Sequence, residues 1–83
     1  MTNDQIRDQI RRFLTTTFPA AGVELTDETD LLEEWFVDSL GIVQTVMFLE
    51  QTFGIQLGRA DIDAVNFRTV ATLAALVEAR LAG

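Results

Sequence analysis

The residues that could do chemistry in this 83-residue sequence are carboxylates, hydroxyls and a few cations. Cysteine and histidine are absent, which removes disulfides, thiolate metal sites and the commonest general base. One reactive pair, Asp38 and Ser39, stands at the expected start of a helix, and both are good N-cap residues. A serine in the first helical turn has an accessible hydroxyl beside free N–H groups and the positive end of the helix dipole. Such a position favours a negatively charged group beside the hydroxyl. The plainer reading of Ser39 is a helix cap alone.

The acidic stretch 26–30 is the other candidate site, because it has the composition of a calcium-binding loop. Counted from Asp27, the third ligand position is Thr29, the fifth is Leu31 and the turn glycine is Leu32. This pattern fails the requirements of the loop, so we predict no metal site and expect solvated acids. We also find no paired-acid arrangement, and we predict no catalytic residue.

The elements that must position Ser39 are predicted to be helices. The first has its apolar residues at helical spacing, on one face: Ile6, Ile10, Phe13 and Leu14. Thr2 and Gln5 have the spacing of a capping box, and Pro19 and Gly22 are expected to end this helix.

A connection of about 20 residues, 19–38, precedes Ser39, which is unusually long for so small a domain. Its apolar residues can pin it to the core: Leu31, Leu32, Trp35, Phe36 and Val37. We expect one of the adjacent aromatics Trp35 and Phe36 to anchor the connection and the other to be exposed, where it can contact a partner.

The helix that begins at Asp38 and Ser39 carries two apolar rows and ends at Gly54, a typical C-cap. We expect the first row to be buried: Ile42, Val46, Leu49 and Phe53. The second row, Leu40, Val43 and Met47, is expected to be partly exposed and to contact partners. Alternatively, this helix is central and is covered on both sides.

The remaining sequence predicts a short helix near 59–65 and a last helix capped by Thr69. The last helix has one apolar face: Val70, Leu73, Ala74, Val77 and Leu81. The fold class is therefore an all-α bundle of three main helices and one short helix, with a long first loop, in a single domain of residues 1–83.

The net charge of −7, from 13 acidic and 6 basic residues, argues against binding to nucleic acid or to an anionic membrane. A basic protein partner is the natural complement, although acidity can also serve solubility alone. No apolar run is long enough to span a bilayer, and the first residues lack the features of a signal peptide. We expect a cytoplasmic monomer.

The segment Val37-Asp38-Ser39-Leu40 resembles the Asp-Ser-Leu attachment motif of acyl and peptidyl carrier proteins. The resemblance continues through DSLGIVQTVMFLEQTFGIQL (38–57) and NFRTVATLAALV (66–77). Within the first of these segments it includes Glu50, Phe53, Gly54, Ile55 and Leu57. The resemblance implies a four-helix carrier bundle with 4′-phosphopantetheine on Ser39, and Asp38 would help to bind the phosphopantetheinyl transferase with its magnesium ion.

The resemblance also implies a non-catalytic function: a discrete carrier that holds an aminoacyl or acyl group as a thioester. A loading ligase, adenylation enzyme or acyltransferase would supply the group, and synthases or tailoring enzymes would use it. The partner surface would comprise Leu40, Val43, Met47, Trp35, Phe36 and Glu50.

The sequence departs from primary fatty-acid carriers in having Gly41, Gln44, Gln51 and Thr52 where acids are common. This favours specialised biosynthesis of the polyketide or nonribosomal-peptide type. The alternatives are a primary fatty-acid carrier and an unmodified helical module that binds other proteins.

Overall fold

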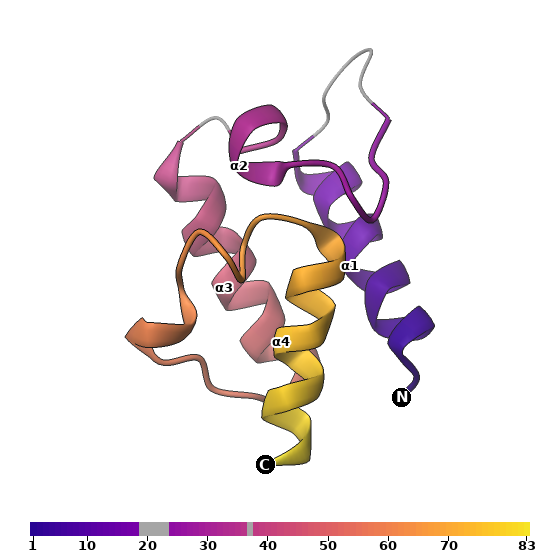
Figure 1. Cartoon of the computed structure of the whole chain (residues 1–83), viewed down its shortest axis with the longest axis vertical. Coiled ribbons are helices and arrows are strands. Elements are labelled where there is room, and N and C mark those ends of the chain that lie inside the picture. Colours follow the sequence, from indigo (N-terminus) through magenta and orange to yellow (C-terminus); the bar gives the residue numbers. More distant parts are fainter. Residues whose placement is uncertain (19–23, 37) are drawn as a thin grey trace.

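Helices and connecting segments alone make up the computed structural model, which describes residues 1–18, 24–36 and 38–83 (Figure 1). The helices in order are α1 (Asn3–Thr17), α2 (Leu31–Glu34), α3 (Ser39–Phe53) and α4 (Val70–Ala82), with a 3₁₀ turn at Arg59–Asp61 between the last two. The predicted all-α class with three main helices is confirmed.

The short helix predicted near 59–65 is wrong in extent, because only the 3₁₀ turn Arg59–Asp61 forms there. Carboxylates take backbone donors in this segment: Asp61 accepts from Gly58 N at 2.8 Å, and Asp63 from Asn66 N at 2.7 Å. Such local bonds compete with helix formation. The short α-helix, α2, lies instead within the long connection, and Pro19 and Gly22 lie outside the described residues.

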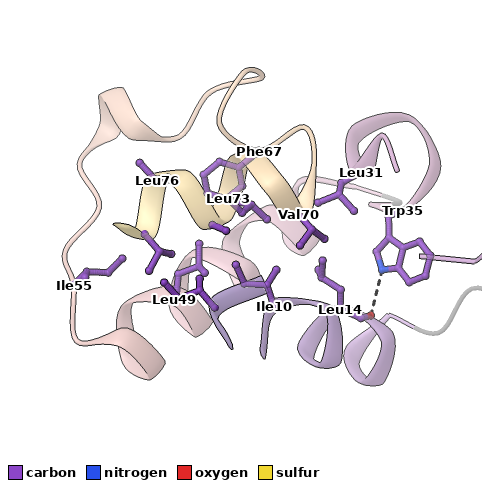
Figure 2. Packing of buried hydrophobic residues seen from close by; sticks show 13 residues of the cluster. Ile10, Leu14, Leu31, Trp35, Leu49, Ile55, Phe67, Val70, Leu73 and Leu76 are labelled. Atoms are coloured by element: carbon purple, nitrogen blue, oxygen red, sulfur yellow. Dashed lines mark hydrogen bonds between the residues drawn. The ribbon is translucent and has the colours of Figure 1, made fainter. Parts of the chain in front are cut away.

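The core forms where α1 and α4 pack together and where α3 closes against them (Figure 2). Its fully buried members include Ile6, Ile10, Leu14, Leu31, Leu49, Phe67, Val70, Leu73 and Val77. The predicted apolar residues of α1 at positions 6, 10 and 14 are thus buried, while Phe13 is partly buried at the edge of the core.

Side-chain caps fix where the helices begin and end. Thr2 and Gln5 form the predicted capping box of α1, and the Thr69 hydroxyl accepts from Thr72 N at the start of α4. Gly54 ends α3 in the left-handed conformation, with φ of 66°, and donates its N–H to Glu50 O. The predicted caps at these three positions are confirmed.

Trp35 anchors the connection between α1 and α3. Its side chain is buried, and its indole N–H donates to Leu14 O at 3.2 Å near the end of α1 (Figure 2). Backbone bonds to the start of α4 add to this anchor, since Leu31 N donates to Arg68 O and Ala71 N to Asp27 O. The prediction that apolar residues pin this connection is therefore confirmed.

Two carboxylates of the connection form long-range ion pairs, whereas we expected them to be solvated. Asp27 binds both Arg7 and Arg11 of α1. Asp30 binds Arg68 at 2.9 Å and caps α2. Burial raises the pKa of Asp27, but hydrogen bonds from Arg11 and Arg7 and their charges outweigh it, so that this pKa lies below its ordinary value.

Five phenylalanine rings line the junction of α1, α3 and the connection. Phe13 stacks on Phe48 with ring centres 4.1 Å apart. Three edge-to-face pairs extend this contact. Phe13 meets Phe18, which in turn meets Phe36, and Phe48 meets Phe53. Aromatic pairs in these geometries add to the stabilisation from burial. They tie the segment just before α3 to the end of α1.

The molecule measures 38 × 25 × 20 Å, and both termini lie toward one end of the longest axis (Figure 1). The beginning of α3 lies toward the opposite end, beside α2. Ser39 is the first residue of α3, so the candidate modification site is far from both termini.

Acid should destabilise this fold through Asp27 and Asp61. Hydrogen bonds from Arg80 and from Gly58 N–H lower the pKa of Asp61 as well. A carboxylate whose pKa is lowered by folding contributes its full stabilisation above the pKa of a free aspartate, about 3.9. This contribution is lost as the pH falls through the lower pKa of the folded protein. Without histidine, the thermal midpoint should be flat between about pH 6 and 8 and should fall below about pH 4.

Thermal unfolding followed by circular dichroism checks this expectation. Asp27→Asn should lower the midpoint at pH 7 by a few degrees and should weaken its acid dependence. The matched control, Glu28→Gln, changes the exposed neighbouring acid and should do neither. Equal midpoints for the two variants at pH 7 would contradict the structural role of Asp27.

Candidate functional site

Ser39 is an exposed residue in the first turn of α3. Asp38 is the N-cap, as predicted, and its carboxylate accepts from Leu40 N at 3.0 Å. Because Asp38 provides the side-chain cap, the Ser39 hydroxyl is not needed for it. Within the described residues no hydrogen bond engages that hydroxyl, and Val37 lies outside them.

The outer side of α3 is apolar. Leu40 is 60% exposed, and Val43 and Met47 are each 52% exposed, so the predicted exposure of this row is confirmed. The row begins directly after Ser39 and continues along the helix for two turns. Any enzyme that reaches the Ser39 hydroxyl therefore meets this apolar surface beside it.

The inner side of α3 differs from the prediction. Gly41, Thr45 and Leu49 are buried, while the predicted inner residues Ile42, Val46 and Phe53 are only partly buried. Thr45 can lie inside because its hydroxyl donates to Gly41 O at 2.8 Å. The inner face is therefore shifted by one residue at Gly41 and Thr45, toward smaller side chains, while the predicted burial of Leu49 is confirmed.

Gly41 lies inside because Phe36 fills the space beside it. A Cβ atom on Gly41 would lie 3.0 Å from Cδ1 of Phe36. Phe36 also meets the Phe18 ring edge-to-face, with ring centres 5.9 Å apart. The missing acid at position 41, read from the sequence as a lost charge, thus coincides with a close contact to the Phe36 ring.

Of the two aromatics before the motif, Trp35 is the anchor and Phe36 is partly buried. The predicted contribution of Trp35 to a partner surface is wrong, because its indole is 5% exposed and faces the core. Glu50 is also partly buried, and its carboxylate accepts from Leu57 N at 3.0 Å. That bond supports the turn after α3 and leaves Glu50 less free to bind a partner.

A small apolar cavity of about 220 Å³ opens beside the first turns of α3. It is lined by Leu32, Ile42, Ile62, Asp63, Ala64 and Phe67. Among the residues of α3, Ile42, one helical turn after Ser39, lines this cavity.

Negative charge is concentrated before and at the start of α3. No basic residue occurs between Arg12 and Arg59. Asp27 and Asp30 are neutralised by arginines, whereas the exposed acids in this region have no ion pair among the described residues. These exposed acids are Glu24, Glu28, Glu33, Glu34 and Asp38.

Comparison with known protein families matches residues 4–77 to the family described as "Phosphopantetheine attachment site". The chain belongs to this family. It is a carrier protein that bears phosphopantetheine and serves other enzymes without being a catalyst itself.

Several relatives of this carrier protein are named acyl carrier proteins. That of Thermotoga maritima is 24% identical over 80 residues, 96% of each chain. Acyl carrier protein 2 of Pseudomonas aeruginosa is 30% identical over 67 residues, 81% of this chain and 82% of the relative. Polyketide-8 synthase acyl carrier protein 2 of Streptomyces avermitilis is 27% identical over 60 residues, 72% of this chain and 69% of the relative.

The start of α3 fits the group that the family carries. Phosphopantetheine needs a hydroxyl that another enzyme can reach, and the exposed Ser39 offers one. The N-terminus of a helix of 15 residues favours the negative charge of a phosphodiester. In the described ranges, each helix falls short of the length and apolar character that would let it cross a membrane.

Replacement of Gly41 should destabilise the carrier protein. Gly41→Glu places a side chain against Phe36 and should cost about 1–3 kcal/mol of unfolding free energy, as overpacking does. Gln44→Glu adds the same charge one turn later on the exposed side and should stay within about 0.5 kcal/mol of wild type. Urea unfolding measures both values, and equal stability of the two variants would refute the packing role of Gly41.

Proposed function

We propose that Ser39 is the residue that carries the 4′-phosphopantetheine arm. The observation that carries this proposal is the exposed Ser39 hydroxyl at the start of α3, directly after Asp38 in the Asp-Ser-Leu sequence. Supporting features are the free hydroxyl, the side-chain cap supplied by Asp38 and the exposed apolar row beside it.

The loading reaction that we propose uses coenzyme A as the donor. Ser39 Oγ attacks the phosphorus that bears pantetheine, a phosphodiester forms, and the pyrophosphate bond of coenzyme A breaks. 3′,5′-Adenosine bisphosphate leaves, and the hydroxyl proton passes to a base on the transferase or to water. Asp38, one residue from Ser39, would help to hold the magnesium ion of the transferase. When bound, the arm supplies a terminal thiol to which cargo attaches as a thioester, so the chain needs no cysteine.

For the pathway, we propose specialised biosynthesis of the polyketide or nonribosomal-peptide type. One relative is named for a polyketide synthase, which is consistent with this assignment, while others have the general name acyl carrier protein. The outer side of α3 presents Leu40, Val43 and Met47 with the uncharged Gln44 among them. An enzyme adapted to an acidic helix would find few charges there.

The partners in this proposal are a phosphopantetheinyl transferase, a loading ligase or acyltransferase, and downstream synthase or tailoring enzymes. They would contact Leu40, Val43, Met47 and the partly exposed Phe36, with Glu50 at the margin. The competing functions are a primary fatty-acid carrier, which shares Ser39 but differs in partners, and an unmodified interaction module, which has no use for the serine.

Intact-protein mass spectrometry tests the central claim. Incubation with coenzyme A, Mg²⁺ and a broad-specificity transferase should add about 340 Da, the mass of the arm. Ser39→Ala should remain unmodified while it stays folded, since Asp38 supplies the cap. No mass gain in folded wild type would favour the unmodified module instead, and a gain in Ser39→Ala would assign the arm elsewhere.

The choice of pathway can be tested with a malonyl transferase of primary fatty-acid synthesis. If the missing charge on α3 excludes such enzymes, loaded Gln44→Glu should be used several-fold better than loaded wild type. Gln56→Glu, which lies after α3 and is also exposed, is the matched charge control. Efficient use of the wild type would instead support the primary fatty-acid carrier.

A further inference from the structure

A groove lies between α1 and α3, where the rings of Phe13 and Phe48 stack. Both rings line two adjoining hollows, of about 280 and 880 Å³, which also share Thr17. The smaller hollow is bounded on one side by residues of α3 that follow Ser39 in the sequence: Gln44, Met47, Phe48, Gln51 and Thr52. The groove therefore combines an aromatic surface with side-chain amides and hydroxyls.

Among the described residues, the lining of the smaller hollow includes no charged side chain, although the chain carries a net charge of −7. In the larger hollow, Nε of Arg12 lies 3.1 Å from the Asp8 carboxylate, so these two charges neutralise each other. In the ranges that the structure describes, no hydrogen bond engages the polar side chains around the smaller hollow: Thr17, Gln44, Gln51 and Thr52. These amides and hydroxyls can therefore bond to a ligand.

The exposed apolar row of α3 leads from Ser39 to this groove. Leu40 directly follows Ser39, and Met47, the last residue of the row, also lines the smaller hollow. At a rise of about 1.5 Å per residue, Gln51 lies roughly 18 Å from Ser39 along the axis of α3. A 4′-phosphopantetheine arm has about a dozen bonds between phosphorus and sulfur and spans roughly 15 Å when extended. A group held on its thiol can therefore reach the smaller hollow.

The lining of the groove favours one class of cargo. A charged group would find no opposite charge among the described residues of the smaller hollow. A long saturated chain would displace water from amides and hydroxyls without bonding to them, which costs free energy. An aromatic ring can pack against Phe13 and Phe48, and a hydroxyl on that ring can bond to an amide such as that of Gln51. The best fit is an uncharged aromatic acyl group with a polar substituent.

We propose that the groove between α1 and α3 binds an uncharged aromatic acyl group carried on the arm, and that Leu40, Val43 and Met47 contact the arm along the way. This inference rests on the proposed function of Ser39. Because the cargo is tethered to Ser39, its effective concentration at the groove is of millimolar order, so that even a weak contact is occupied. The groove shares no lining residue with the cavity beside Ile42.

Nuclear magnetic resonance of the loaded protein tests the proposal. The broad-specificity transferase attaches the arm together with its cargo from para-hydroxyphenylacetyl-coenzyme A, and intact mass confirms complete loading. Nuclear Overhauser contacts should join the ring of the cargo to Phe13 and Phe48, and the backbone amide signals of Thr17 and Gln51 should shift. Protein loaded from hexanoyl-coenzyme A, or with the arm alone, should show shifts about threefold smaller at these residues, since neither group stacks on the rings.

Gln51→Ala removes an amide from the groove and should lower the shift at Thr17 about twofold without a change in loading, because the ring hydroxyl loses a hydrogen-bond partner. The matched control, Gln56→Ala, removes an exposed amide after α3 and should behave like wild type. Equal shifts at Thr17 in the two variants would contradict the contact with Gln51.

Contacts from the cargo ring to Ile62 and Ala64 instead would overturn the inference, because they would place the cargo in the cavity beside Ile42. Shifts at Thr17 that depend on protein concentration would assign the groove to a second copy of the chain and would overturn it as well. In both cases the loading of Ser39 would stand. Failure of folded wild type to gain the arm from coenzyme A would overturn the proposed function and this inference together.

Discussion

The hydrogen bond from the buried Trp35 indole to Leu14 O is the constraint on which the site depends. The long connection has to cross the bundle between α1 and α3, and the core supplies few polar groups to hold it. The carbonyl oxygen of Leu14 also accepts from Phe18 N. One atom near the end of α1 thus binds both the residue after α1 and the residue after α2. Since a buried indole N–H without a partner would be costly, this bond holds the end of α2 against the end of α1.

Local rules predicted most of the helical framework because its signals lie within a few residues of each other. Thr2 with Gln5, Thr69 with Thr72, and Gly54 are such local signals, and the caps formed as expected. The ion pairs of Asp27 were not predictable in this way, since Arg7 and Arg11 lie 20 and 16 residues away along the chain. The same holds for α2, a helix of four residues that depends on the Asp30 cap and on the burial of Leu31 and Trp35.

The site itself was predicted in part. The serine, its aspartate and the exposed row follow from the motif and from helical spacing, whereas the buried side of α3 depends on tertiary packing. Gly41 illustrates the difference, because its missing side chain reads as a lost surface charge until the Phe36 ring is seen against it. Packing of the connection and the sequence of α3 are thus linked at Gly41, where a side chain would have to displace the Phe36 ring.

The placement of both termini toward the end opposite the start of α3 has a consequence for how the domain can be used (Figure 1). A flexible linker joined at either terminus would pull on the far end of a body 38 Å long and would leave Ser39 directed outward. The rigid length of the bundle would then add to the reach of the arm, as a spacer between tether and cargo.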